Sequence, residues 1–230
     1  YLNAPNNNAV YLYGTGRADS VDESTNAALN NLASKLSVNI SSVISTYKNS
    51  TSSNQEDSTY SKDVSQDIRV EVEKMRFSNV KIEKSVQLGN HFFTLIKISR
   101  EQLFKEQYKA FEITDSTINK KLNILDDKPI LEQIQSLQYL YPQLNQAKKD
   151  AFILYTINNG FEYAKYVAKY DNSIDSITLL KDKITLQLST NEKSRFFYNE
   201  LLQLLNENAY KISRNSHTQV KMHNISRYST

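Results

Sequence analysis

The sequence predicts an α+β protein with an amino-terminal α/β sandwich, an antiparallel helical hairpin and a small carboxy-terminal β-α-β-β unit. Apolar residues alternate with polar ones in segments at both ends of the chain, which is typical of strands. In the middle of the chain they recur every seven residues, which is typical of paired helices. The 230 residues include only 4 Gly and 3 Pro, which favours long regular elements. We therefore expect three parts, at residues 1–98, 99–170 and 171–230.

The first part opens with a short strand, a two-glycine turn and a helix. Residues 10–13 are apolar and aromatic and suit a buried strand. Gly14 and Gly16 are interpreted as a structural turn, because glycine permits backbone angles and close approaches that a Cβ would block. Ser20 and Glu23 form a capping box that begins the helix. Its apolar stripe consists of Val21, Thr25, Ala28, Leu29, Leu32, Ala33 and Leu36.

The remainder of the first part is predicted from alternation and turn residues. Residues 37–47 read as a second strand, and the polar stretch 48–59 as a mobile loop. Residues 61–75 have helical spacing, although a strand stays open for their second half. Two strands then follow, joined by the hairpin turn Gly89-Asn90. These strands cover residues 80–88, with a polar middle, and 92–98.

A glycine pair between a strand and a helix also suggests a dinucleotide-binding loop. The third glycine of that fingerprint would fall at position 19, which holds Asp19. A carboxylate there would repel an anion at the helix N-terminus. The tight structural turn is therefore the favoured interpretation.

The same residues carry a resemblance to a known family. Gly14-x-Gly16-x-Ala18, then Ala28, Leu32-Ala33-x-x-Leu36 and the expected strand Val38-x-Ile40 resemble the opening of the Lpp-twenty lipoprotein family. The amino-terminal domain of flagellar assembly protein T is similar to that family. The resemblance covers about residues 10–100. It implies an α+β domain of the bacterial cell envelope without enzymatic activity, and thus an exported protein of the periplasm, outer membrane or medium.

The second part reads as two long helices. Ser99 and Gln102 form a capping box, and residues 126–129 form a turn with Pro129 at the next helix start. Pro142 lies within the second helix and should kink it. Asn158-Asn159-Gly160 should end it. The seven-residue repeats are Phe104, Phe111, Ile118 and Leu125 in the first helix and Ile130, Leu137, Leu144 and Ala151 in the second.

The third part is predicted to begin after an aromatic helix at residues 161–170. A short helix at 173–182 precedes a strand at 183–188, and Thr190 caps a further helix. Two closing strands complete the part, at residues 210–213 and 218–228. This β-α-β-β order is similar to the TolB amino-terminal domain.

The basic residues gather at the carboxy-terminal end. The net charge of the chain is +3, and beyond Glu207 there are four basic residues and no acid. We favour a solvated strand pair and tail. The other interpretation is contact with an anionic surface, such as lipid headgroups or a polymer. The residues of this possible contact are Lys211, Arg214, Lys221 and Arg227.

The residue inventory points away from catalysis. The chain has no Cys, which excludes disulfides, thiol nucleophiles and Cys-ligated zinc. His217 and His223 flank Lys221, which makes a poor metal site, and the sequence has no Gly-x-Ser-x-Gly or Walker motif. We therefore expect no enzyme, no cofactor and no metal.

These observations predict a non-enzymatic bacterial cell-envelope or secreted protein. Its work would be assembly, adhesion or protein–protein interaction, with envelope or host proteins as partners and a membrane surface as a further contact. The alternative is a nucleic-acid or anionic-polymer binder that uses the basic carboxy-terminal strands, with nucleic acid the less favoured ligand. Because the chain begins with Tyr1, we also expect a processed or truncated N-terminus.

Overall fold

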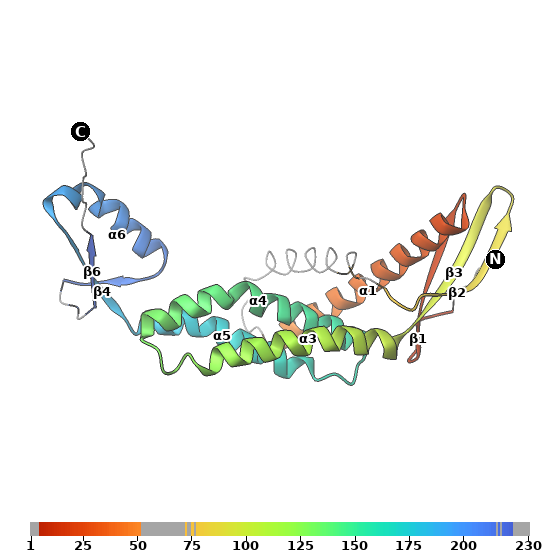
Figure 1. The fold of residues 1–230 in the computed structure, drawn as a ribbon, viewed down its shortest axis with the longest axis horizontal. Coiled ribbons are helices and arrows are strands. Elements are labelled where there is room, and N and C mark those ends of the chain that lie inside the picture. Colours follow the sequence, from red (N-terminus) through yellow and green to blue (C-terminus); the bar gives the residue numbers. More distant parts are fainter. Residues whose placement is uncertain are drawn as a thin grey trace. The chain divides into compact units, whose positions relative to one another are not determined.

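The computed structural model describes residues 5–51, 72, 75, 77–214, 216 and 218–222 (Figure 1). The chain separates into two compact units, and each contains helices and strands, which confirms the α+β class. Unit 1 consists of Tyr1–Ser116 and Asn145–Ala168, and unit 2 of Thr117–Leu144 and Lys169–Thr230. The division into three parts at positions 98 and 170 stays a prediction.

Unit 1 is built on a three-stranded antiparallel sheet with the order β1-β3-β2. The strands are β1 (Tyr11–Ala18), β2 (Lys81–Leu88) and β3 (His91–Ser99). Gly89 has a φ of 61° in the tight turn between β2 and β3, which confirms the predicted hairpin. Helix α1 (Val21–Thr51) packs along β1 and β3. Its first turn is capped as expected, since Ser20 Oγ accepts the N–H of Glu23 at 3.2 Å.

The expected strand at residues 37–47 is wrong, because α1 continues through it to Thr51. β-Branched residues favoured a strand, but Ile40 and Ile44 continue the buried stripe of Leu32 and Leu36 at a helical spacing of four. Val38, which would share a strand face with Ile40, is 67% exposed. Burial of the stripe on the sheet outweighs the small difference in intrinsic propensity. The first part of the expected loop is also helical, whereas residues 52–59 lie outside the described residues, as does the predicted helix 61–75 apart from Val72 and Met75.

Gly14 and Gly16 lie within β1 and do not form a turn. The chain turns after Ala18 instead, immediately before the Ser20 cap. What the glycines provide is the close approach of α1. A Cβ on Gly14 would lie 2.2 Å from the carbonyl oxygen of Ala28, and one on Gly16 would lie 2.0 Å from that of Ser24. The helix backbone thus rests directly on the strand.

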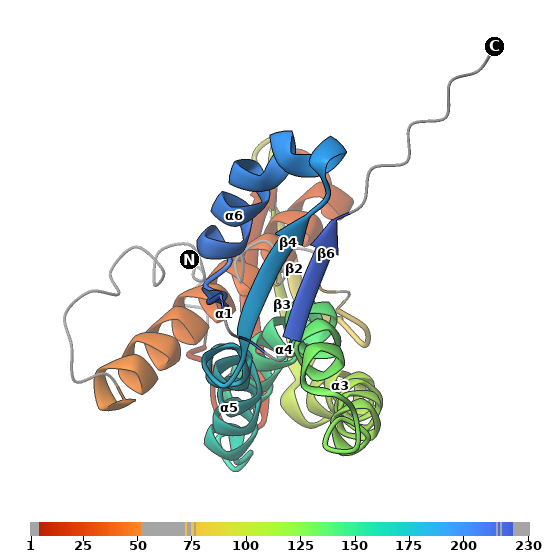
Figure 2. The same ribbon diagram turned by 90° about the vertical axis from the view of Figure 1, so that its left-hand side faces the viewer.

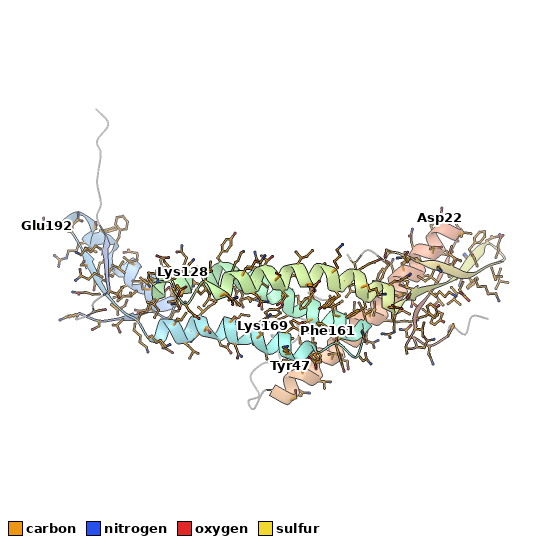
Figure 3. The ribbon with its side chains drawn as sticks, turned by 60° about the horizontal axis from the view of Figure 1, so that its bottom comes forward. Asp22, Tyr47, Lys128, Phe161, Lys169 and Glu192 are labelled. Carbon is orange, nitrogen blue, oxygen red and sulfur yellow. The ribbon has the colours of Figure 1, made fainter. Side chains whose placement is uncertain are left out.

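Three long helices complete the middle of the chain, and each contributes residues to both units. They are α3 (Arg100–Asn123), α4 (Ile130–Ile157) and α5 (Tyr163–Asp182). The Ser99 cap is confirmed by the N–H of Gln102, 3.4 Å from Ser99 Oγ. In unit 1 aromatic rings from α3, from α5 and from the segment before α5 form a cluster, and Figure 3 labels its member Phe161. Its members are Phe104, Tyr108, Phe111, Phe161 and Tyr166.

The two helices expected at residues 161–170 and 173–182 are one helix, α5. The polar run at 171–173 suggested a break. Instead, the Ser173 hydroxyl donates to the carbonyl of Lys169 at 3.0 Å, so this residue is accommodated within the helix. Tyr170, just before this polar run, is completely buried, so the helix is held in place by packing at this point.

Unit 2 ends in a small sheet with the order β5-β4-β6, in which both pairs are parallel (Figure 2). The β-α-β-β order is confirmed by β4 (Thr185–Thr190), α6 (Tyr198–Glu207), β5 (Lys211–Ile212) and β6 (Thr218–Met222). The predicted Thr190 cap is wrong, because Thr190 ends β4. The side chain of Asn191 accepts the N–H of Ser194 at 2.9 Å and caps a 3₁₀ turn, η1 (Glu192–Phe197), that leads into α6.

The core of unit 2 joins the sheet to the long helices. Ile134 of α4 packs with Ile184 and Leu186, all three buried. Further apolar side chains surround them; they are Ile130, Ile177, Leu180, Leu205, Tyr210, Ile212 and Val220. The face of the small sheet that carries Leu186, Ile212 and Val220 therefore packs in the core of unit 2.

Candidate interaction surfaces

The other face of the unit 2 sheet is polar. Residues paired across neighbouring strands point to the same side of a sheet, and alternate residues point to opposite sides. Since Leu186 and Ile212 lie in the core, the alternate positions form the opposite face. We call this surface the polar sheet face. It consists of Thr185, Gln187, Ser189, Lys211, Gln219 and Lys221.

Two of the four predicted basic residues lie on the polar sheet face, at its opposite edges. Lys211 pairs with Thr185 on β5, and Lys221 pairs with Ser189 on β6. They lie on opposite edges, two strand spacings apart and offset by four residues, which separates their Cα atoms by about 16 Å. That distance exceeds the Debye length of about 8 Å at physiological ionic strength. The two charges therefore suit an extended polymer better than a single small anion.

Lys211 is also partly neutralised. Its ammonium group lies 2.9 Å from a carboxylate oxygen of Asp182, with both side chains 57% exposed, and it donates to the Asp182 carbonyl at 3.2 Å. Arg214 is exposed between β5 and β6, and Arg227 lies outside the described residues. Lys221, at the opposite edge of the polar sheet face, is exposed.

An exposed aromatic pair lies at the end of η1, immediately before α6. Phe196 is 79% exposed and Phe197 is 45% exposed, and their rings contact each other edge to face at 5.4 Å. The two rings contribute exposed apolar surface beside the polar sheet face's strand β4.

The two edges of the unit 1 sheet are protected against the addition of a further strand. Side chains bond the backbone groups on the outer edge of β1. Strand β2, at the other edge, has a register shift and several charged side chains, both of which disfavour edge pairing. The contacts on β1 are Asn7 with the Tyr13 N–H, Asn31 with the Thr15 N–H, and Lys35 with the Tyr13 carbonyl.

Arg100 occupies a structural position in unit 1. Its Nη1 donates to the carbonyls of Thr156 at 2.9 Å and Ile157 at 2.8 Å, where α4 ends. Burial lowers the pKa of this guanidinium, but the negative end of the α4 dipole favours its charge. An open groove of about 680 Å³ adjoins it, and the engaged Nη1 makes the arginine a helix cap.

Asp19 and the glycine pair also have structural roles. Asp19 Oδ1 lies 2.7 Å from Nδ1 of His91, which ties the start of α1 to β3. The space beside Gly14 and Gly16 is filled by the backbone of α1, so no phosphate fits against them. This geometry supports the structural interpretation over nucleotide binding.

The described part of the chain contains neither a metal-binding cluster nor a membrane-spanning helix. Across those residues, no three His, Asp or Glu side chains lie close enough together to hold a metal ion. Of the helices that the structure describes, none combines the length and apolar character needed to cross a membrane.

Comparison with known proteins finds a family model that matches the first part of the chain. Residues 1–99 match the family model described as LPP20 lipoprotein, which confirms the resemblance predicted for residues 10–100. The match supports a bacterial envelope or secreted protein. No curated protein matched the chain. A solved structure, the secreted protein HP1454 from the human pathogen Helicobacter pylori, aligns with 16% identity over 93% of this chain and 78% of its own, with a TM-score of 0.49.

Proposed function

From the match of residues 1–99 to the LPP20 lipoprotein family, we propose an exported bacterial protein that works at the envelope or outside the cell by binding other molecules. The proposed roles are assembly, adhesion or protein–protein interaction, without catalysis. The family match is the single observation that carries this proposal. The TolB-like topology of residues 171–230 stays a prediction and adds nothing to it.

Two surface ion pairs of unit 1 have pKa shifts opposite to those that acid–base catalysis favours. The pKa of Lys97 is raised chiefly by its hydrogen bond to Glu83, and that of Glu101 is lowered chiefly by its hydrogen bond from Lys105. Both pairs lie at the surface of unit 1. Such pairing moves the pKa of Lys97 and that of Glu101 away from neutral pH. A general acid or base works best with a pKa near neutral pH.

Cell fractionation tests the proposal. The full-length natural protein should be recovered from the periplasmic, outer-membrane or culture-medium fraction, with a cytosolic enzyme followed as the marker of leakage. Recovery of the full-length protein only with the cytosolic marker would contradict export and the proposed function with it.

A second candidate function is binding of an anionic polymer through the polar sheet face. The observation that favours it is the placement of Lys211 and Lys221 on one open face together with Gln187 and Gln219. Amide and hydroxyl groups beside the two cations can donate to sulfate or phosphate oxygens along a polymer. The separation of about 16 Å between the Cα atoms of Lys211 and Lys221 favours a polymer over a small anion.

Heparin chromatography distinguishes this candidate from a general effect of charge. Retention should fall steeply with salt, as it does when counterions are released. Lys221→Glu should elute at clearly lower salt than the wild type. Lys120→Glu, which makes the same charge change at an exposed position on α3, should shift elution much less. Equal shifts would show that net charge alone causes retention.

A further inference from the structure

An open groove lies beside the connection between α3 and α4 in unit 2 (Figure 3 labels Lys128 at this place). It has a volume of about 590 Å³ and is formed by the last turns of α3, the connection and the first half of α4. We call it the hairpin groove. Its lining residues are Lys121, Ile124, Leu125, Lys128, Glu132, Gln135, Ser136, Tyr139 and Leu140.

The hairpin groove has an apolar floor and exposed apolar walls. Leu125 and Leu140 are buried at 6% and 1% exposure, so they form the floor. Ile124 is 55% exposed and Tyr139 is 74% exposed, so large apolar surfaces face solvent on both sides. Clustered apolar surface of this kind, rimmed by polar residues, is typical of an interaction site.

The spacing of the lining residues matches a site for a helix. On α4 the lining positions 132, 135, 136, 139 and 140 recur every three or four residues, so they form one helical ridge. Lys121 lies in the last turn of α3, and Ile124, Leu125 and Lys128 lie in the connection that follows it, so these residues form the opposite wall. The side chains of a further helix can pack beside the α4 ridge, which favours a helical occupant.

Helix α5 does not cover this side of α4. Ile134 faces the core that Ile177 and Leu180 of α5 share. Five residues of an α-helix turn through about 500°, so Tyr139 points about 140° away from Ile134. The hairpin groove is thus on the far side of α4 from α5, where one more helix would continue the bundle.

The rim of the hairpin groove indicates the charge of the occupant. Lys121 donates to Oε1 of Gln143 at 3.3 Å and lies over the Tyr139 ring at 5.5 Å. Lys128 donates to Ser136 Oγ at 3.5 Å. These partners are neutral, so both lysines keep their charge available, whereas Glu132 is the acidic residue of the lining. Acidic side chains beside an apolar stripe would complement this rim.

We propose that the hairpin groove binds an amphipathic helix of another protein, with a leucine-type apolar stripe flanked by acidic residues. The stripe packs on Ile124, Leu125 and Leu140 beside the Tyr139 ring, and the acidic residues pair with Lys121 and Lys128. This inference names the partner class for the proposed binding function and rests on it.

Fluorescence anisotropy with a designed peptide tests the proposal on the full 230-residue chain. The probe is a labelled 14-residue peptide with Leu at positions i, i+3, i+4 and i+7 and Glu beside them, held helical by a lactam bridge. The bridge removes the cost of ordering a short helix. A scrambled peptide of the same composition and a peptide with Lys in place of Glu are the ligand controls. The designed peptide should bind at least tenfold more tightly than either.

Three variants locate the site. Tyr139→Glu and the double variant Lys121→Glu/Lys128→Glu should each weaken binding at least tenfold. Tyr141→Glu, also on α4 and 43% exposed but not in the groove lining, should stay within twofold of the wild type. Circular dichroism of each variant checks that the fold is retained, which is expected because the altered side chains are largely at the surface.

The remaining outcomes overturn the proposal. Equal binding of the scrambled peptide, or an unchanged affinity of Tyr139→Glu, would mean that the groove is not a helix site. Self-association of the chain that Tyr139→Glu abolishes, without peptide binding, would assign the groove to a second copy. Peptide binding and cell fractionation are independent measurements. A failure of peptide binding would overturn the helix site and would not affect the test of export.

Discussion

At the scale of single residues, the contact between β1 and α1 depends on the absence of two side chains. Ser24 and Ala28 are completely buried, and their carbonyl oxygens occupy the space where Cβ atoms on Gly16 and Gly14 would lie. Ser24 Oγ also lies 2.6 Å from Thr94 Oγ1, so the helix is joined to β3 as well. Backbone atoms cannot rotate away as a side chain can, which makes this contact intolerant of added volume.

We expect Gly14→Ala and Gly16→Ala each to lower the free energy of unfolding by about 1–3 kcal/mol or more, because α1 must move off the strand. Urea denaturation followed by circular dichroism measures this loss. Gly160→Ala is the matched control, since its Cβ would meet only the flexible Asn158 side chain at 3.3 Å. If Gly160→Ala proved as costly as Gly14→Ala, the close approach would not be the cause.

Two tyrosines make the stability of unit 1 sensitive to alkaline pH. Burial raises the pKa of the Tyr163 and Tyr166 phenols above the ordinary value of about 10. The unfolded chain then loses these protons at lower pH than the folded chain does. Stability should therefore be unaffected by these groups below about pH 9 and fall as the pH rises through 10 and above.

Urea unfolding between pH 8 and pH 11 measures the effect. The double variant Tyr163→Phe/Tyr166→Phe should lose less stability over that interval than the wild type. Parallel losses in the two proteins would show that burial of these phenols does not control the alkaline transition.

At the scale of elements, the aromatic cluster explains why the predicted helices hold together in unit 1. The Phe111 side chain is 2% exposed, and its ring packs edge to face with Phe161 at 5.7 Å and with Tyr166 at 5.0 Å. These residues come from α3, from the segment before α5 and from α5 itself. Their mutual packing indicates a structural role for these aromatic residues.

Phe111→Ala should lower the free energy of unfolding by about 3–5 kcal/mol, because it removes a buried ring and leaves a cavity. Lys120→Ala, at an exposed position of the same helix, should change it by less than about 0.5 kcal/mol. Guanidinium unfolding of both variants provides the comparison. Equal effects would contradict the assignment of Phe111 to the core of unit 1.

At the scale of the whole molecule, each of the three long helices contributes residues to both units. Ile130 and Ile134 of α4 pack with Ile184 and Leu186 near the carboxy-terminal sheet. A domain boundary at 170 would cut α5 and leave this core without its α4 side. Independent folding of the carboxy-terminal part is therefore disfavoured.

We expect the fragment 171–230 to lack a cooperative thermal transition, whereas the fragment 99–230, which keeps α4 and all of α5, should melt cooperatively. The first fragment would expose the apolar face of the sheet that normally packs in the core of unit 2. Circular dichroism melting of both fragments tests this. A sharp transition in 171–230 alone would support the boundary predicted at position 170.

The sequence by itself determined the features that depend on neighbouring residues. The caps at Ser20 and Ser99 are correct, as is the Gly89 hairpin, because a cap or tight turn is decided within about four residues. The β-α-β-β order near the carboxy terminus is correct for the same reason, since strand alternation and the following helical stripe are local patterns.

Only the tertiary structure decided the features that need a partner distant in sequence. Ile40 and Ile44 could serve a strand or a helix, and burial on β1 and β3 selects the helix. The same packing gives Gly14 and Gly16 their role. Strand pairing brings Lys211 and Lys221 to one face, and the pairing of α3 with α4 forms the groove beside Tyr139. Propensities of a few tenths of a kcal/mol are overridden when burial of a large side chain contributes about 1.5–3 kcal/mol.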